Sequence, residues 1–113
     1  MIKRVFTIFI LTLLLLFNTP VYSLDTSSKT LEKYTKKISN KFTSTYCNTS
    51  KFGISYERAL AFAIGETNKE FKNNKLNNFI DYSLLKNSIV NDLENNCQVY
   101  AFDTNSLENL KFN

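Results

Sequence analysis

The chain has 113 residues, two cysteines and no histidine, and its formal net charge is +4 at pH 7. Without histidine it lacks the side chain most often used as a general base near neutral pH, so Ser-His-Asp and Cys-His arrangements are excluded. Its two glycines do not lie in a glycine-rich run, which excludes a phosphate-cradling loop.

The first 23 residues have the pattern of an export signal. Lys3 and Arg4 form a positive n-region, and an apolar run extends from Val5 to Phe17. The run is shorter than the roughly 20 apolar residues that cross a bilayer, and it has the length of a signal h-region. The pattern of small residues predicts cleavage between Ser23 and Leu24, and hence a protein that works outside the cytoplasm. An uncleaved signal anchor that tethers the protein to the membrane is the alternative.

Loss of this segment changes the charge of the chain. It removes two cations, so the remaining 12 Lys+Arg and 10 Asp+Glu leave a net charge of +2. Lysines scattered among acids at so low a charge do not form the phosphate-tracking patch that nucleic-acid binding requires. We therefore expect no nucleic-acid partner. The residues after the signal suit one small domain.

Two amphipathic helices are predicted first, because apolar residues recur at three- and four-residue intervals. One covers about 28–46, with lysines opposite its apolar face. The other covers about 56–73, with Ser55 as N-cap, and follows a turn in which Gly53 takes a positive φ at little cost. The stripe of the second helix that is predicted to face the core comprises Tyr56, Leu60, Ala63, Ile64, Thr67 and Phe71.

A third helix is predicted over about 82–97, with Asp81 as N-cap. In the loop before it, Leu76 and Phe79 are expected to pack against the bundle. After residue 97 the periodicity fades, so 98–113 is interpreted as an irregular tail that follows a helical domain spanning 24–97.

Three helices joined by short loops predict an all-α fold, a small antiparallel three-helix bundle. Cys47 follows the first predicted helix and Cys97 ends the third, so an up-down-up bundle brings both to the same end. An even cysteine count in an exported chain favours a disulfide. Two free thiols or half of a metal site are the alternatives, but a structural zinc site takes four Cys or His ligands. We therefore expect neither a metal nor another cofactor.

One face of the second helix is a candidate interaction surface. Gly65 lies mid-helix, where glycine costs about 1 kcal/mol relative to alanine. Together with Ala61 it makes a low-profile face, explained either by close approach of a neighbouring segment or by contact with a partner helix. Phe62 points away from the predicted core stripe. Either the tail covers it, or it is an exposed aromatic anchor for a partner.

The remaining charged residues favour solvated surfaces over chemistry. Glu66 and Glu70 are spaced i, i+4, but they lie on the polar face beside a lysine, so an acid/base site is the weaker interpretation. Lys86 falls within the apolar stripe of the third helix, where its stem can pack while the ammonium reaches water. An ion pair with Glu57 or Glu66 is the alternative. No small-molecule ligand is evident.

The stretch from Cys47 through Phe52-Gly53-Ile54-Ser55-Tyr56-Glu57 to Phe62-Ala63-Ile64-Gly65-Glu66 and Lys69-Glu70-Phe71 resembles a group of small exported helical proteins of cyanobacteria. The resemblance covers roughly 41–97. It implies a signal peptide, a short helical domain and a periplasmic or thylakoid-lumen location, and it carries no assigned activity. The chain departs from the pattern at Gln98-Val99-Tyr100, where a glycine-containing turn is expected.

Three functional hypotheses follow. The first is an exported, non-enzymatic accessory protein that binds a protein partner and associates with a membrane complex or membrane surface. The second is a periplasmic stress chaperone with a single disulfide, by analogy with small helical chaperones. An enzyme is the third and is disfavoured by the missing catalytic groups.

Overall fold

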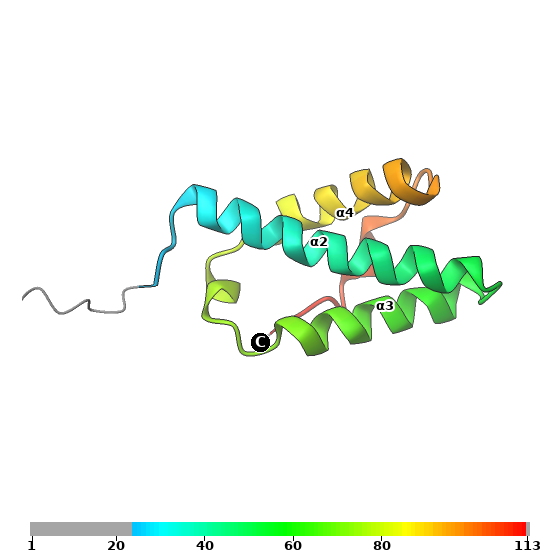
Figure 1. The fold of residues 1–113 in the computed structure, drawn as a ribbon, viewed down its shortest axis with the longest axis horizontal. Coiled ribbons are helices and arrows are strands. Elements are labelled where there is room, and N and C mark those ends of the chain that lie inside the picture. Colours follow the sequence, from blue (N-terminus) through cyan, green and yellow to red (C-terminus); the bar gives the residue numbers. More distant parts are fainter. Residues whose placement is uncertain (1–23, 113) are drawn as a thin grey trace, which may run out of the picture.

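The computed structural model describes residues 24–112, and within this range its secondary structure is entirely helical (Figure 1). The elements, in chain order, are α2 (Ser28–Lys51), α3 (Tyr56–Phe71), the 3-10 helix η1 (Lys75–Asn78), α4 (Tyr82–Cys97) and the 3-10 helix η2 (Thr104–Leu107). The predicted all-α fold with one disulfide is confirmed. In the described range, none of the helices combines the length and apolar character that crossing a bilayer requires.

The first helix is longer than the periodicity predicted, because it continues to Lys51 and therefore contains Cys47. The last turns of α2 are rich in polar residues, and two threonine hydroxyls there bond to the carbonyl four residues earlier. The Thr45 hydroxyl donates to the Lys41 carbonyl at 2.8 Å, and the Thr49 hydroxyl donates to the Thr45 carbonyl at 2.6 Å. The chain then reverses at Gly53, whose φ of 75° confirms the predicted turn.

Helix α2 is the centre of the bundle. Both α3 and α4 pack along it, on different sides, whereas they make little contact with each other (Figure 1). Asp81 caps α4 as predicted, accepting hydrogen bonds from the backbone N–H groups of Ser83 and Leu84 at 2.9 and 3.3 Å. Ser55 occupies the N-cap position of α3, but its side chain makes no capping hydrogen bond.

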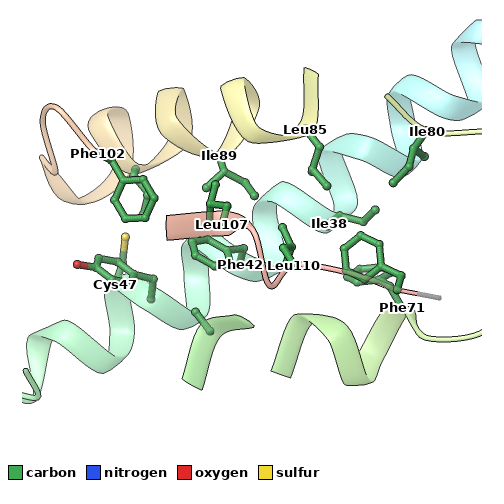
Figure 2. Packing of buried hydrophobic residues seen from close by; sticks show 14 of the residues in the cluster. Ile38, Phe42, Cys47, Phe71, Ile80, Leu85, Ile89, Phe102, Leu107 and Leu110 are labelled. Carbon is green, nitrogen blue, oxygen red and sulfur yellow. The ribbon is translucent and has the colours of Figure 1, made fainter. Parts of the chain in front are cut away.

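The C-terminal segment 98–112 belongs to the core, which the division into a domain ending at 97 and a tail did not foresee. Four of its side chains are buried: Phe102, Leu107, Leu110 and Phe112. Figure 2 shows Leu107 and Leu110 among the buried side chains of the three helices. Because the segment is mostly irregular, its apolar residues follow no helical period, and their burial could not be inferred from spacing.

This segment contacts both outer helices. The ring of Phe112 lies 6.1 Å from that of Phe71 on α3 and 5.9 Å from that of Tyr82 on α4. The Asn68 side chain of α3 donates to the Asn109 carbonyl at 2.9 Å and accepts from the Lys111 N–H at 3.1 Å. The segment therefore joins α3 to α4 where the two helices do not pack directly.

Two predicted core residues are exposed instead. Tyr56 is 47% exposed, because the buried stripe of α3 is rotated toward Ala59, Ala63, Thr67 and Phe71. Phe79 is 52% exposed, since the chain turns there and buries Ile80 in its place. Leu76 packs against the core as predicted.

Candidate interaction surface at the α2–α3 turn

The outer face of α3 lies open to solvent. Helical spacing places Arg58, Ala61, Phe62, Gly65 and Lys69 on this face, and all five are exposed. Phe62 itself is 52% exposed. The C-terminal segment therefore does not cover Phe62, and the exposed-anchor interpretation remains.

Gly65 is not needed for packing within the chain. A Cβ placed on Gly65 would have no heavy atom within 4 Å, so the expected close approach of a neighbouring segment does not occur. An alanine would fit this exposed, mid-helix position and would favour the helix. Nothing in the packing of residues 24–112 explains the glycine.

An open apolar groove adjoins Phe62 where α3 begins. It has a volume of about 670 Å³ and is lined by Thr45, Asn48, Thr49, Phe52, Ile54, Arg58 and Phe62. Phe52 is 83% exposed and Ile54 is 42% exposed. Both flank Gly53, whose left-handed backbone turns the chain and holds the two side chains on either side of the reversal. Sequence reasoning missed Phe52, Ile54 and Arg58, although two apolar residues around a turn glycine could have indicated an exposed apolar loop.

The disulfide and an aromatic cluster support this end of the bundle. Cys47 and Cys97 are bonded, with Cα atoms 5.8 Å apart, as the cysteine positions predicted. Next to Cys47, the ring of Tyr46 lies 6.3 Å from that of Tyr56 and 6.2 Å from that of Phe102. Burial raises the pKa of Tyr46. The start of α3 is thus held against α2 and the C-terminal segment, which keeps the groove walls in place.

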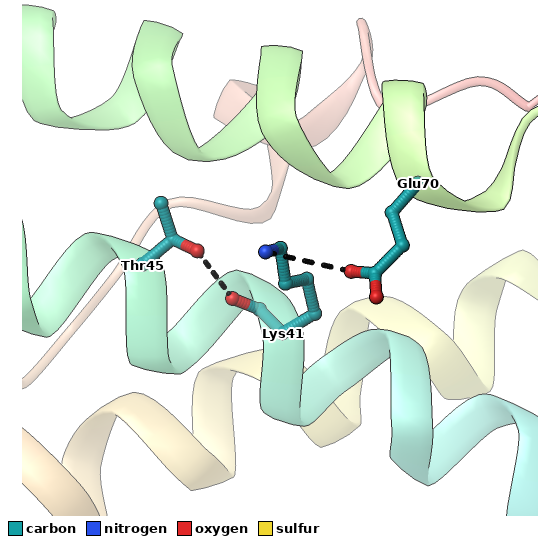
Figure 3. Close-up of polar contacts among 3 residues, drawn as sticks. All are labelled: Lys41, Thr45 and Glu70. Atoms are coloured by element: carbon teal, nitrogen blue, oxygen red, sulfur yellow. Dashed lines mark hydrogen bonds and ion pairs between the residues drawn. The ribbon is translucent and has the colours of Figure 1, made fainter.

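One ion pair is formed within residues 24–112, and it links α2 to α3 (Figure 3). Lys41 Nζ lies 3.5 Å from Glu70 Oε2, and both side chains are partly exposed. Glu70 is thereby engaged in a surface pair. Lys86 is half-buried and pairs with neither Glu57 nor Glu66, which leaves a packed stem with a solvated ammonium as its interpretation.

Leu24 is the first described residue and is 42% exposed, whereas Ser23 and the signal segment lie outside the described residues. Among residues 24–112, Cys, Asp and Glu side chains form no group of three that could hold a metal ion. Comparison of the chain with protein-family models, with curated proteins and with solved structures found no match. The site is therefore interpreted from its own residues, and the resemblance to cyanobacterial exported proteins stays a prediction.

Proposed function

We propose that this protein is an exported, non-enzymatic accessory protein that binds an amphipathic helix of a protein partner along the outer face of α3. The observation that carries the proposal is the half-exposed Phe62 beside an open apolar groove. Exposed aromatic residues in such positions concentrate binding energy. Export is supported by the signal-like N-terminal sequence and by the disulfide, which persists in oxidising compartments.

The shape of α3 favours a helix as the bound element. Ala61 has only a methyl side chain and Gly65 has none, and the space around Gly65 is open, so a partner backbone can approach closely there. Phe62 would fill a gap between side chains of the partner helix, which is the ridges-into-grooves geometry of helix packing. The groove next to Phe62 would receive apolar residues of the same partner helix.

The charges of the face define the partner further. Arg58 and Lys69 are exposed at the two ends of the small-residue stretch. They are separated by eleven residues, which corresponds to about 16 Å along a helix. A partner helix of about three turns, apolar on one face and acidic toward both ends, complements this surface.

The proposal is tested by site-specific photo-crosslinking in the source organism. A photoreactive phenylalanine analogue is placed at Phe62 and, as a matched control, at Tyr100, which is 66% exposed elsewhere on the surface. A crosslink to one protein from position 62 and not from 100 is expected. The crosslinked segment, synthesised as a peptide, should bind the purified protein and lose about tenfold in affinity with Phe62→Ser, which removes an exposed aromatic contact.

Steric variants complete the test. Gly65→Leu fills the open space and should weaken peptide binding while leaving the fold intact. Equal crosslinking from both positions, or a peptide that binds Phe62→Ser unchanged, would contradict the proposal. A crosslink between two copies of this chain would show that the surface binds the protein itself, which contradicts a separate partner. Binding of unfolded proteins would favour the chaperone hypothesis.

A further inference from the structure

A second apolar groove lies at the opposite end of the bundle, away from the α2–α3 turn. It has a volume of about 540 Å³, lies between the first turns of α2 and of α4, and is lined by Ser28, Leu31, Glu32, Thr35, Lys36, Phe79, Asp81, Leu84 and Ser88. Leu84 is 63% exposed and Phe79 is 52% exposed. Neither side chain is part of the core, so both can contact a binding partner.

The positive charge of the protein is concentrated at this end. Segments 25–37 and 72–81, which the chain path brings together there (Figure 1), contain six lysines and three carboxylates. The lysines are Lys29, Lys33, Lys36, Lys37, Lys72 and Lys75. The rest of the described chain has six cations and seven carboxylates. The charge of +2 that seems evenly spread along the sequence is therefore divided unequally in space.

These lysines are not neutralised by the protein itself. The ion pair of Lys41 with Glu70 includes none of them, and no other ion pair occurs in the described part of the chain. Two of the three carboxylates at this end accept hydrogen bonds from backbone N–H groups or a nearby hydroxyl. Asp81 caps α4, and Asp25 accepts hydrogen bonds from the Ser27 N–H at 2.9 Å and the Thr30 hydroxyl at 2.7 Å. All six lysines are exposed.

We propose that this basic apolar end, defined by the six lysines together with Phe79 and Leu84, binds the surface of a membrane that contains anionic phospholipids. Phe79 and Leu84 would enter the boundary between headgroups and acyl chains, and the lysines would lie among the phosphates. Aromatic and aliphatic side chains flanked by lysines are the combination that interfacial membrane binding uses. A partner bound by charge alone would gain nothing from two exposed apolar side chains.

This surface lies at the opposite end of the bundle from the groove at the α2–α3 turn. The length of α2, about 36 Å for its 24 residues, separates the two ends. A protein bound to the membrane through its basic apolar end therefore presents the groove at the α2–α3 turn away from the lipid. Membrane binding and partner binding could then occur together.

Vesicle sedimentation tests the proposal with the protein recovered from the exported fraction, its N-terminus established by intact mass. The probes are vesicles of phosphatidylcholine alone and of phosphatidylcholine with one-third phosphatidylglycerol. We expect binding to the anionic vesicles only, with a partition coefficient that falls by about fivefold for each lysine removed in Lys29→Gln, Lys33→Gln and Lys36→Gln. The double variant Phe79→Ser/Leu84→Ser should lose about tenfold or more.

The matched control is Phe52→Ser, which removes an exposed apolar side chain at the other end and should leave the partition coefficient unchanged. Because all substituted side chains are exposed, loss of binding by unfolding is checked through the melting temperature. Equal binding to both vesicle types, absence of binding, or an equal loss with Phe52→Ser would overturn the proposal. Binding to polyglutamate without binding to anionic vesicles would also overturn it and would indicate an acidic protein partner.

Discussion

The two interfaces of α2 are built differently. Toward α4, the interface contains three fully buried branched side chains, Leu85, Ile89 and Leu93, and it is closed by the disulfide. Toward α3, most of the buried side chains are small: Ala59, Ala63 and Thr67 precede the single large ring of Phe71. Small side chains bury less apolar area, so α3 gains less from packing on α2.

Helix α3 therefore relies for the rest of its attachment on the C-terminal segment, which contacts α4 as well. One hydrogen bond donated and one accepted by the Asn68 side chain, and the ring contact between Phe71 and Phe112, attach α3 to that segment. The helix that carries the candidate interaction surface is thus the one with the weaker attachment to the centre of the bundle. Local opening of α3 is expected to cost less free energy than local opening of α4.

The largest expected effect comes from removing the covalent link on the α4 side. Cys47→Ala/Cys97→Ala opens a loop with a sequence separation of 50 residues, and the chain-entropy model predicts a loss of about 4 kcal/mol in the free energy of unfolding. Urea denaturation measures this loss. In the wild type, amide hydrogens of α4 should exchange more slowly than those of α3, and most of this difference should disappear in the double variant. An unchanged difference would contradict the view that the disulfide strengthens the attachment of α4.

Truncating Phe112 removes the ring contact that attaches α3 to the C-terminal segment. Phe112 is 1% exposed, and Phe112→Ala should destabilise the protein by about 3 kcal/mol, because it leaves a cavity between the aromatic rings. Exchange in α3 should accelerate more than exchange in α4, which keeps the disulfide. Phe52→Ala, at an 83% exposed position, is the control and should change the free energy of unfolding by less than about 0.5 kcal/mol.

A buried hydrogen-bond network around Tyr34 also connects α2 with the end of α3 and with the C-terminal segment. Its hydroxyl donates to Asn77 Oδ1 at 2.5 Å, and the Asn77 amide donates to the Phe71 carbonyl at 2.9 Å and to the Phe112 carbonyl at 3.4 Å. Tyr34→Phe leaves a buried acceptor unpaired and should cost about 1–2 kcal/mol. An unchanged unfolding midpoint in urea would show that this network does not stabilise the fold.

The same residue predicts a pH dependence. Burial, assisted by the nearby Tyr82, raises the pKa of Tyr34 from 10.0 to about 12. Because the folded state holds this proton more tightly than the unfolded state, its contribution is fully present below about pH 10 and is lost as the pH rises through about 12. The free energy of unfolding should fall more steeply over this range in the wild type than in Tyr34→Phe. If the free energy of unfolding falls equally steeply with pH in both proteins, Tyr34 does not cause the pH dependence.

A single substitution in α3 is expected to stabilise the weaker of the two interfaces of α2. The Thr67 hydroxyl is fully buried and finds no hydrogen-bond partner among the described residues. Thr67→Val replaces it with a methyl group of similar size and should raise the free energy of unfolding by about 1 kcal/mol. Thr35→Val is the matched control, since the Thr35 hydroxyl already donates to the Leu31 carbonyl at 2.8 Å; no gain is expected there.

The smallest effect is expected at the surface ion pair between α2 and α3. Lys41 and Glu70 keep 36% and 48% of their side chains exposed, so water and salt screen their attraction. Lys41→Gln should cost less than about 0.5 kcal/mol. A loss above 1 kcal/mol, measured in low salt, would mean that α3 depends on this pair rather than on the C-terminal segment.

Much of the fold could be predicted because its signals are local. Apolar spacing located the three helices, Asp81 marked the start of α4, and Gly53 marked the turn. The helix end at Lys51 was missed because threonine hydroxyls, rather than apolar periodicity, accompany the last turns of α2. The candidate surface was predicted in part. Phe62 was identified, whereas Phe52 was not, since exposure in a turn leaves no periodic trace.

The helices and the pairing of Cys47 with Cys97 could be inferred from the order of residues alone, because both follow from spacing along the chain and from the direction of successive helices. Three features became visible only in the packed fold: segment 98–112 completes the core, Phe62 stays exposed, and the lysines gather at one end. These features depend on which distant segments meet. The burial of an irregular segment and the summed charge of two loops in space leave no period in the sequence.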